Sequence, residues 1–147
     1  MNSLYRGFDS RLVSDIQANL FHHTPRAPKN TERESHGHAD SWFLNRFGIK
    51  ARSSTLVCTT NFEQARSYGY TYKITPIEPF LIIYSALVKD FLEHELELSS
   101  NSKSDIWAWL ECKHYKIVRS VKDIEPEFLG EVMVNCEHYS AIPYLIR

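Results

Sequence analysis

The sequence predicts a single domain of the α+β class. Its 147 residues match one ordinary domain, and 43% hydrophobic against 24% charged residues is enough for a packed core. Aromatic residues reach 13%, which favours strands because aromatic side chains fit a pleated, half-buried surface. Short apolar runs of strand length alternate with stretches of helical spacing along the chain. Together these observations predict helices and strands around one core.

The first third of the chain is expected to hold one strand and two helices. Residues 4–8 fit a short strand. Ser10 is a candidate N-cap for a helix to about residue 21, since four apolar residues follow at helical spacing. Residues 22–34 are rich in Pro, Asn and charged side chains and predict a loop of the length that often carries function. A second helix is predicted for 35–47, with Gly48 as its end.

The remaining two thirds are expected to alternate strands with short helices. The predicted strands are 56–60, 71–75, 80–84, 115–121, 131–134 and 138–142. The predicted helices are 61–68, which ends at Gly69, and the acidic amphipathic stretch 89–98. Residues 106–110 fit either a helix or a strand.

Charge and cysteine content narrow the function classes. A formal net charge of −1 argues against a protein that coats duplex nucleic acid through phosphate contacts. The three cysteines cannot all pair and form no dense disulfide pattern. No signal segment stands at the N-terminus, and the longest apolar runs, such as 80–84, are far shorter than a membrane span. We therefore expect a cytoplasmic protein in a reducing compartment, with no membrane among its partners.

Three separated segments carry the candidate functional residues. They are Leu4-Tyr5-Arg6-Gly7-Phe8, then Leu56-Val57-Cys58-Thr59-Thr60 with Ala65-Arg66-Ser67-Tyr68, and finally Gly130-Glu131-Val132-Met133-Val134 with Tyr139-Ser140-Ala141-Ile142. In their order and strand context they resemble the mono-ADP-ribosyltransferases of the arginine–serine–glutamate type. In that family a Tyr-Arg-Gly strand comes first, a Ser-Thr-Ser strand follows mid-chain, and a late strand supplies the catalytic Glu.

The resemblance implies a fold and a set of site residues. The fold would be ADP-ribosyltransferase-like, with two small facing β-sheets around an NAD cleft and flanking helices. Glu131 would be catalytic, and NAD⁺, the substrate, would be bound by residues that come from the first two segments: Arg6, Thr59, Thr60 and Tyr68. The place of Tyr68 resembles the histidine–tyrosine–glutamate branch, in which a Tyr stacks on nicotinamide.

These residue types suit the chemistry. Cleavage of the nicotinamide–ribose bond passes through an oxocarbenium-like state, so an ionised Glu131 can stabilise the positive charge that develops on the ribose. The planar fork of Arg6 can hold a diphosphate better than a lysine can. A hydroxyl of Thr59 or Thr60 can bind the ribose or fix the rotamer of Glu131. No metal ion is required.

Two departures from the family pattern bear on the acceptor. Cys58 stands where the family has the first serine, and Leu129 stands where many members carry a second acidic or amide residue that positions the acceptor. We therefore expect transfer of ADP-ribose to a nucleic acid, RNA included, rather than to protein. The small size is similar to toxin or phage-conflict effectors, for which an antitoxin or inhibitor protein would be a partner.

Alternatives remain open at the level of the sequence. The chain could be a catalytically degenerate member of this fold that serves as a binding or inhibitor module, because Cys58 and Leu129 depart from the pattern. It could also be an RNA 2′-phosphotransferase, which needs several basic residues, and Arg6, Arg26 and Arg52 are the candidates. Whatever the reaction, residues 22–34 are either a solvated connector or a loop beside the NAD cleft that contacts the acceptor or a phosphate. The Cys-x-His pairs at 112–114 and 136–138 lack the paired-cysteine spacing of structural zinc sites.

Overall fold

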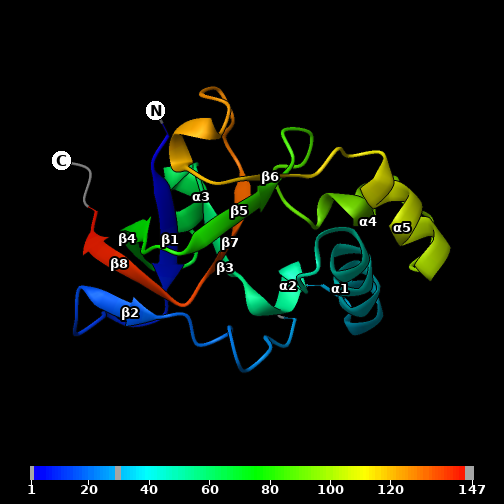
Figure 1. The fold of residues 1–147 in the computed structure, drawn as a ribbon. Helices are drawn as coiled ribbons and strands as arrows, with labels where there is room; N and C mark the ends of the chain where they lie inside the picture. Colours follow the sequence, from blue (N-terminus) through cyan, green and yellow to red (C-terminus); the bar gives the residue numbers. More distant parts are fainter. Residues whose placement is uncertain (1, 29–30, 145–147) are drawn as a thin grey trace.

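In the part of the chain that the structure describes, eight strands form one antiparallel sheet (Figure 1). The computed structural model describes residues 2–28 and 31–144, and in it the strand order is β2-β8-β4-β1-β3-β7-β5-β6. The strands are β1 (Leu4–Phe8), β2 (Ile16–Ala18), β3 (Leu56–Thr59), β4 (Tyr70–Pro76), β5 (Phe80–Tyr84), β6 (Lys116–Val118), β7 (Glu131–Cys136) and β8 (His138–Pro143). The architecture is therefore α+β, as the sequence predicts.

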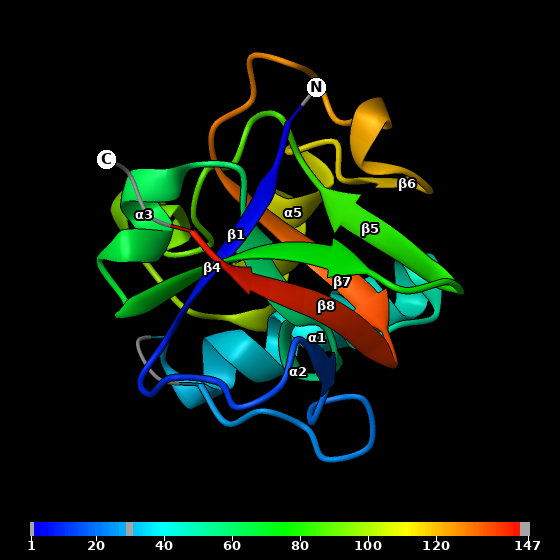
Figure 2. The ribbon, with the colours of Figure 1, turned by 90° about the vertical axis from the view of Figure 1, so that its left-hand side faces the viewer.

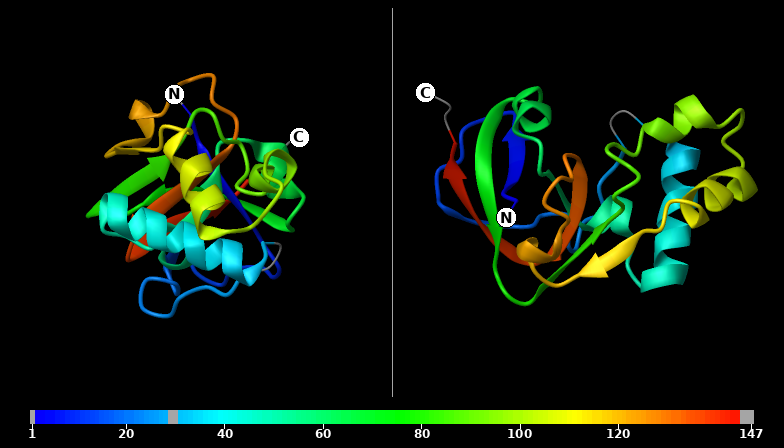
Figure 3. Two further views of the ribbon diagram at one scale, coloured as in Figure 1. Left: turned by 90° about the vertical axis from the view of Figure 1, so that its right-hand side faces the viewer. Right: turned by 90° about the horizontal axis from the view of Figure 1, so that it is seen from above.

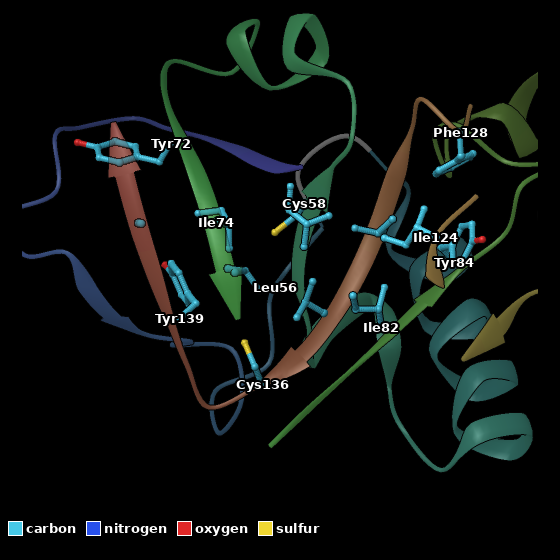
Figure 4. Close-up of a cluster of buried hydrophobic side chains, with 14 residues drawn as sticks. Leu56, Cys58, Tyr72, Ile74, Ile82, Tyr84, Ile124, Phe128, Cys136 and Tyr139 are labelled. Carbon is cyan, nitrogen blue, oxygen red and sulfur yellow. The ribbon is translucent and has the colours of Figure 1, made fainter. Parts of the chain in front are cut away.

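The sheet is continuous but strongly curled. Two separate sheets were expected, whereas β1 and β3 join the two halves through the pair Tyr5↔Thr59. The half with β4 and β8 faces the half with β7 and β5, as the view from above in Figure 3 shows. A hydrophobic cluster fills the space between them, and in Figure 4 Ile74 and Tyr139 lie across from Leu56. The outcome is two facing layers made from one sheet.

Helices cover the outer face of the half that contains β7. The helices of the described residues are α1 (Arg33–Phe47), α2 (Ala51–Ser54), α3 (Phe62–Arg66), α4 (Glu93–Glu97) and α5 (Lys103–Glu111), with a 3₁₀ turn at Val121–Asp123. A second hydrophobic cluster joins α1 and α5 to this face, with Phe43 and Leu110 fully buried. Figure 2 looks onto β1, β4 and β8 and shows α1, α2 and α5 behind them.

Strand β7 contributes to both clusters. Val132 and Val134 belong to the cluster between the two halves of the sheet, whereas Met133 belongs to the cluster under the helices. This division follows from the strand geometry, because successive side chains point to opposite faces. Glu131 is two residues before Met133, so its side chain lies on the face that the helices cover.

The predicted helix at 10–21 is wrong. Residues 16–18 form β2, an edge strand whose partner is β8, and no helix is present in this part of the described chain. Val13 and Leu20 are exposed, so these two apolar residues at helical spacing do not pack against the core. Backbone hydrogen bonds join this segment to β8 instead: Asn19 N–H donates to the Glu137 carbonyl and Ala141 N–H donates to the Asp15 carbonyl, both at 2.7 Å. Sheet pairing overrides weak helical periodicity here.

The other predicted elements are present with shifted bounds. The helix at 35–47 is confirmed as α1, and Gly48 ends it in a left-handed conformation with φ of 77°. The stretch 106–110 is helical, within α5. The predicted helix 89–98 shortens to α4, and the predicted strand 115–121 shortens to β6. Among the described helices, none combines the length and apolar character that crossing a membrane requires.

Candidate functional site

A cavity of about 510 Å³ lies where β1, β3 and β7 run side by side. This volume is within the range of small-molecule sites. Its walls come from these three strands, from α3, from the loop before α1, and from segments at α2 and before α4. Of the five residues that the resemblance implies, four line it together: Arg6, Thr59, Tyr68 and Glu131.

Strand register explains why residues far apart in sequence meet here. Tyr5 pairs with Thr59 across β1 and β3, and Thr59 pairs with Glu131 across β3 and β7. Arg6 therefore stands one residue beyond the level of Thr59 and Glu131 in the sheet. The backbone N–H of Glu131 also donates to the Lys89 carbonyl at 2.9 Å, which fixes the start of β7 against the segment before α4.

Glu131 is held by Arg52, which the sequence offers only as a candidate for binding phosphate. Arg52 Nη1 donates to Glu131 Oε1 at 2.5 Å, and both side chains are about seven-eighths buried, with exposed fractions of 13% and 14%. Burial by itself lowers the pKa of Arg52, but the adjacent Glu131 carboxylate outweighs burial and the net pKa is raised. Arg52 is thus a permanent cation beside the carboxylate.

Two further arginines line the cavity. Arg6 Nη1 donates to the Val57 carbonyl at 2.6 Å, and Arg26 donates to the Arg52 and Thr55 carbonyls at 2.9 Å each. Burial together with the charges of Arg6 and Arg52 lowers the pKa of Arg26 to about 10. Carbonyl oxygens do not neutralise a cation, so both guanidinium groups keep their positive charge beside the cavity.

The ring of Phe21 lies near both of these guanidinium groups. The guanidinium carbon of Arg26 is 4.0 Å from the centroid of the Phe21 ring, and that of Arg6 is 5.9 Å from it. Phe21 and Arg26 come from the segment that precedes α1, and Ala27, Pro28 and Thr31 of the same loop also line the cavity. The loop at 22–34, as far as the structure describes it, therefore lies beside the cavity and is not a remote solvated connector.

The two threonines have different places. Thr59 lines the cavity, but its hydroxyl is bonded within its own surroundings: it contacts Gln64 Oε1 at 2.5 Å and the Gly130 carbonyl at 3.1 Å, and it accepts from Asn61 N–H at 3.0 Å. Thr60 is buried and is not among the residues that line the cavity. Its hydroxyl donates to the Phe128 carbonyl at 2.6 Å and accepts from Gly130 N–H at 3.0 Å. Thr60 therefore shapes the turn before Glu131.

Acidic and aromatic side chains also line the cavity. Tyr68 and Asp90 line it together with Glu131. Burial raises the pKa of Tyr68, and the negative charges of Asp90 and Glu131 act in the same direction. The hydroxyl of Tyr68 therefore stays protonated at neutral pH and can donate a hydrogen bond. Arginines and carboxylates thus line the same cavity, with Arg52 and Glu131 in direct contact.

A buried carboxylate holds the backbone that presents Arg52. Asp40 of α1 accepts the N–H groups of Arg52 and Ser53 at 2.8 and 3.2 Å. His36, one turn earlier on α1, lies 3.7 Å from Asp40 and lines the cavity. Burial lowers the pKa of His36, and Arg52 and Arg26 add to this effect while Asp40 opposes it. The sequence signal for this set was weak, because His36 and Asp40 of α1 meet Arg52 and Ser53 of α2 only in the folded chain.

The cysteines take no part in a metal site. Among residues 2–28 and 31–144, no three His, Cys, Asp or Glu side chains form a group that could hold a metal ion. Cys58 and Cys136 are free and buried in the cluster between the two halves of the sheet, and Cys112 is free and exposed. Burial raises the pKa of Cys58 to about 12, so this residue is a neutral core thiol.

The site combines Arg6, Arg26 and Arg52 with the carboxylate of Glu131, and comparison with known proteins adds nothing to that chemistry. No protein-family model, curated protein or solved structure matches the chain.

Proposed function

We propose that the chain is an ADP-ribosyltransferase that cleaves the nicotinamide–ribose bond of NAD⁺. One observation carries the proposal: Arg6, Thr59 and Glu131, from three distant segments, lie on neighbouring strands and line one cavity. These are the residues and the order of strands that the sequence resemblance to arginine–serine–glutamate transferases implies. The finer fold assignment, an ADP-ribosyltransferase-like fold, belongs to the same proposal.

The charged side chains that line the cavity suit the charges of NAD⁺. The diphosphate carries negative charge and would be bound by Arg6 and Arg26. The nicotinamide ring is cationic and would lie near Asp90, Glu131 and Tyr68, whose ring offers a flat face.

The reaction breaks the bond between ribose C1′ and the nicotinamide nitrogen. Nicotinamide leaves with the bonding electron pair and becomes neutral, while positive charge spreads over C1′ and the ring oxygen of the ribose. A carboxylate next to this charge stabilises the transition state, and Glu131 also accepts a hydrogen bond from the 2′-hydroxyl. The acceptor nucleophile then forms a bond to C1′ and loses its proton.

Release of nicotinamide from NAD⁺ tests the proposal directly. Glu131→Gln keeps the shape of the side chain and removes its charge, so we expect the release rate to fall by about 100-fold or more. Glu95→Gln is the matched control, because it makes the same chemical change at an exposed position of α4. Nicotinamide is measured by chromatography and folding by circular dichroism. An inactive wild-type protein would instead favour a degenerate binding or inhibitor module on this fold.

The acceptor is identified by where a label goes. We propose a nucleic acid acceptor, RNA included, in preference to protein, and a role as a toxin or phage-conflict effector with an antitoxin or inhibitor as partner. With NAD⁺ labelled in its adenosine half, the label should enter RNA or DNA. Label in protein would contradict this part of the proposal and leave the NAD⁺-splitting part intact.

The three arginines support a second candidate function. Arg6, Arg26 and Arg52 are the residues an RNA 2′-phosphotransferase on this fold would need for two phosphates, and all three line the cavity. In that case nicotinamide release should depend on added RNA that carries a 2′-phosphate. Release from NAD⁺ without such RNA would exclude this candidate.

A further inference from the structure

Arg52 is fixed at its backbone and at its side chain. Asp40 accepts its backbone N–H at 2.8 Å, and Arg26 donates to its carbonyl oxygen at 2.9 Å. Its guanidinium donates to Glu131 Oε1 at 2.5 Å, while its guanidinium carbon lies 4.6 Å from the centroid of the Phe91 ring. A long, flexible side chain is thus reduced to one conformation, and its terminal group is directed at one carboxylate.

The ion pair is costly as a means of stabilising the fold. Two charges that are only 13% and 14% exposed lose most of their hydration, and apolar residues of the same size would often stabilise a fold as well or better. Arg52 also contacts the sulfur of Met133 at 3.4 Å, so it lies over two successive side chains of the same face of β7. Its position is suited to holding the first residue of β7.

Thr59 and Thr60 do not hold the carboxylate of Glu131. The resemblance implies that a hydroxyl of this strand orients the glutamate, but the Thr59 hydroxyl is engaged by Gln64 and Gly130. The Thr60 hydroxyl is engaged by Phe128 and Gly130 and is buried outside the cavity. The side-chain donor that reaches Glu131 among the described residues is Arg52.

We propose that Arg52 is the positioning residue of Glu131 and takes the orienting role that a serine or threonine hydroxyl would have. This inference rests on the proposed cleavage of NAD⁺. Arg52 binds Oε1 and so fixes the rotamer of the carboxylate. The other oxygen, Oε2, is then presented to the ribose 2′-hydroxyl and the charge at C1′. Arg52 acts through Glu131 and does not itself contact the reacting atoms.

Kinetics of Arg52→Gln and Arg52→Lys separate positioning from substrate binding. A positioning residue affects kcat, whereas an arginine that holds the NAD⁺ diphosphate affects KM. Because a displacement of about 1 Å at a reacting group costs about 100-fold in rate, we expect Arg52→Gln to lower kcat for nicotinamide release by about that factor with KM unchanged. Arg52→Lys keeps a cation that can reach the carboxylate, and we expect it to recover about tenfold of that loss.

The same substitutions are repeated in the Glu131→Gln background. If Arg52 acts only through Glu131, Arg52→Gln causes no further loss of kcat once the carboxylate is gone. Lys113→Gln is the control for loss of an ion pair, since Lys113 pairs with Glu97 at 2.9 Å and neither residue lines the cavity. It should leave kcat unchanged. Where Arg52→Gln does not fold, the split between kcat and KM in Arg52→Lys decides.

The outcomes are distinct. Two results with an active wild type would overturn the positioning role alone. In the first, the Arg52 variants raise KM at constant kcat. In the second, Arg52→Gln lowers kcat by the same factor with and without the Glu131 carboxylate. A wild type that releases no nicotinamide under any condition overturns the proposed function and the positioning role with it.

Discussion

The guanidinium of Arg6 lines the cavity, and within the described residues not all of its N–H groups have hydrogen-bond partners. Its Nη1 is bound to the Val57 carbonyl, while its buried Nε has no hydrogen-bond partner among the described residues. A buried donor without an acceptor costs free energy until a ligand supplies one. In the proposed function this acceptor is a phosphate oxygen of NAD⁺.

Substitution of Arg6 should therefore weaken substrate binding more than catalysis. We expect Arg6→Lys to raise KM for NAD⁺ by about tenfold or more, because lysine cannot replace the planar fork on a phosphate. The change in kcat should be small by comparison. Steady-state nicotinamide release gives both constants, and Arg119→Lys, at an exposed position, is the control. An unchanged KM in Arg6→Lys would remove Arg6 from the binding site.

The sequence predicted the motif residues that line the cavity better than it predicted the residue that holds Glu131 in place. Arg6, Thr59 and Glu131 belong to short motifs in strands, Tyr68 follows the capped helix α3, and all four line the cavity. Arg52 belongs to no motif. It lies on the four-residue helix α2, and only the folding of α1 and β7 around that helix brings it to Glu131.

The contact between β1 and α3 depends on a glycine. A Cβ atom on Gly7 would lie 2.3 Å from the Ala65 carbonyl oxygen and 2.9 Å from the Tyr68 Cβ. The strand that carries Arg6 and the helix that precedes Tyr68 can approach one another only because position 7 has no side chain. Gly7 therefore sets the distance between two walls of the cavity.

Gly7→Ala should be strongly destabilising, whereas Gly37→Ala should not. The first forces β1 and α3 apart and should cost about 1–3 kcal/mol of unfolding free energy. Gly37 is within α1 and an added Cβ meets no atom within 4 Å, so Gly37→Ala should stabilise by up to about 1 kcal/mol. Urea denaturation of both variants measures the difference. Equal stabilities would show that α3 can move away from β1 at little cost.

Elements with strong local signals were predictable, and elements defined by their partners were not. The helix α1 has an apolar face, and Gly48 ends it, so its range was predicted within two residues. The edge strand β2 has only three residues and exists because β8 offers it backbone partners. Val13 and Leu20 have the spacing of a helix face, but both are exposed, so no helix face is buried there.

At the scale of the whole molecule, the curled sheet encloses groups that must stay uncharged. Burial raises the pKa of Cys58 to about 12, of Cys136 to about 11 and of Tyr139 to about 12, with nearby charges modifying the values for Cys58 and Tyr139. All three belong to the cluster between the two halves of the sheet. In the unfolded chain the thiols lose their protons near pH 9 and the phenol near pH 10.

Stability should therefore fall on the alkaline side. Between pH 9 and about 12 the folded state retains protons that the unfolded state has released, so the unfolding free energy decreases as pH rises. Below pH 9 this contribution is fully present. Thermal unfolding from pH 8 to pH 11 should show a falling Tm, with a shallower fall in Cys58→Ala. A Tm that stays constant up to pH 11 would mean that these groups already titrate in the folded protein.

The two-sided burial of β7 has a consequence for how the walls of the cavity move. A strand that packs into a core on each face opens to solvent only when both cores are disrupted, so its backbone amides should be among the slowest to exchange hydrogen. Glu131 is at the start of this strand, whereas Arg26 comes from a loop and Tyr68 from the turn after α3. The backbone that carries the Glu131 carboxylate is thus rigid, and the segments that carry Arg26 and Tyr68 are the ones that can adjust to ligands of different shape.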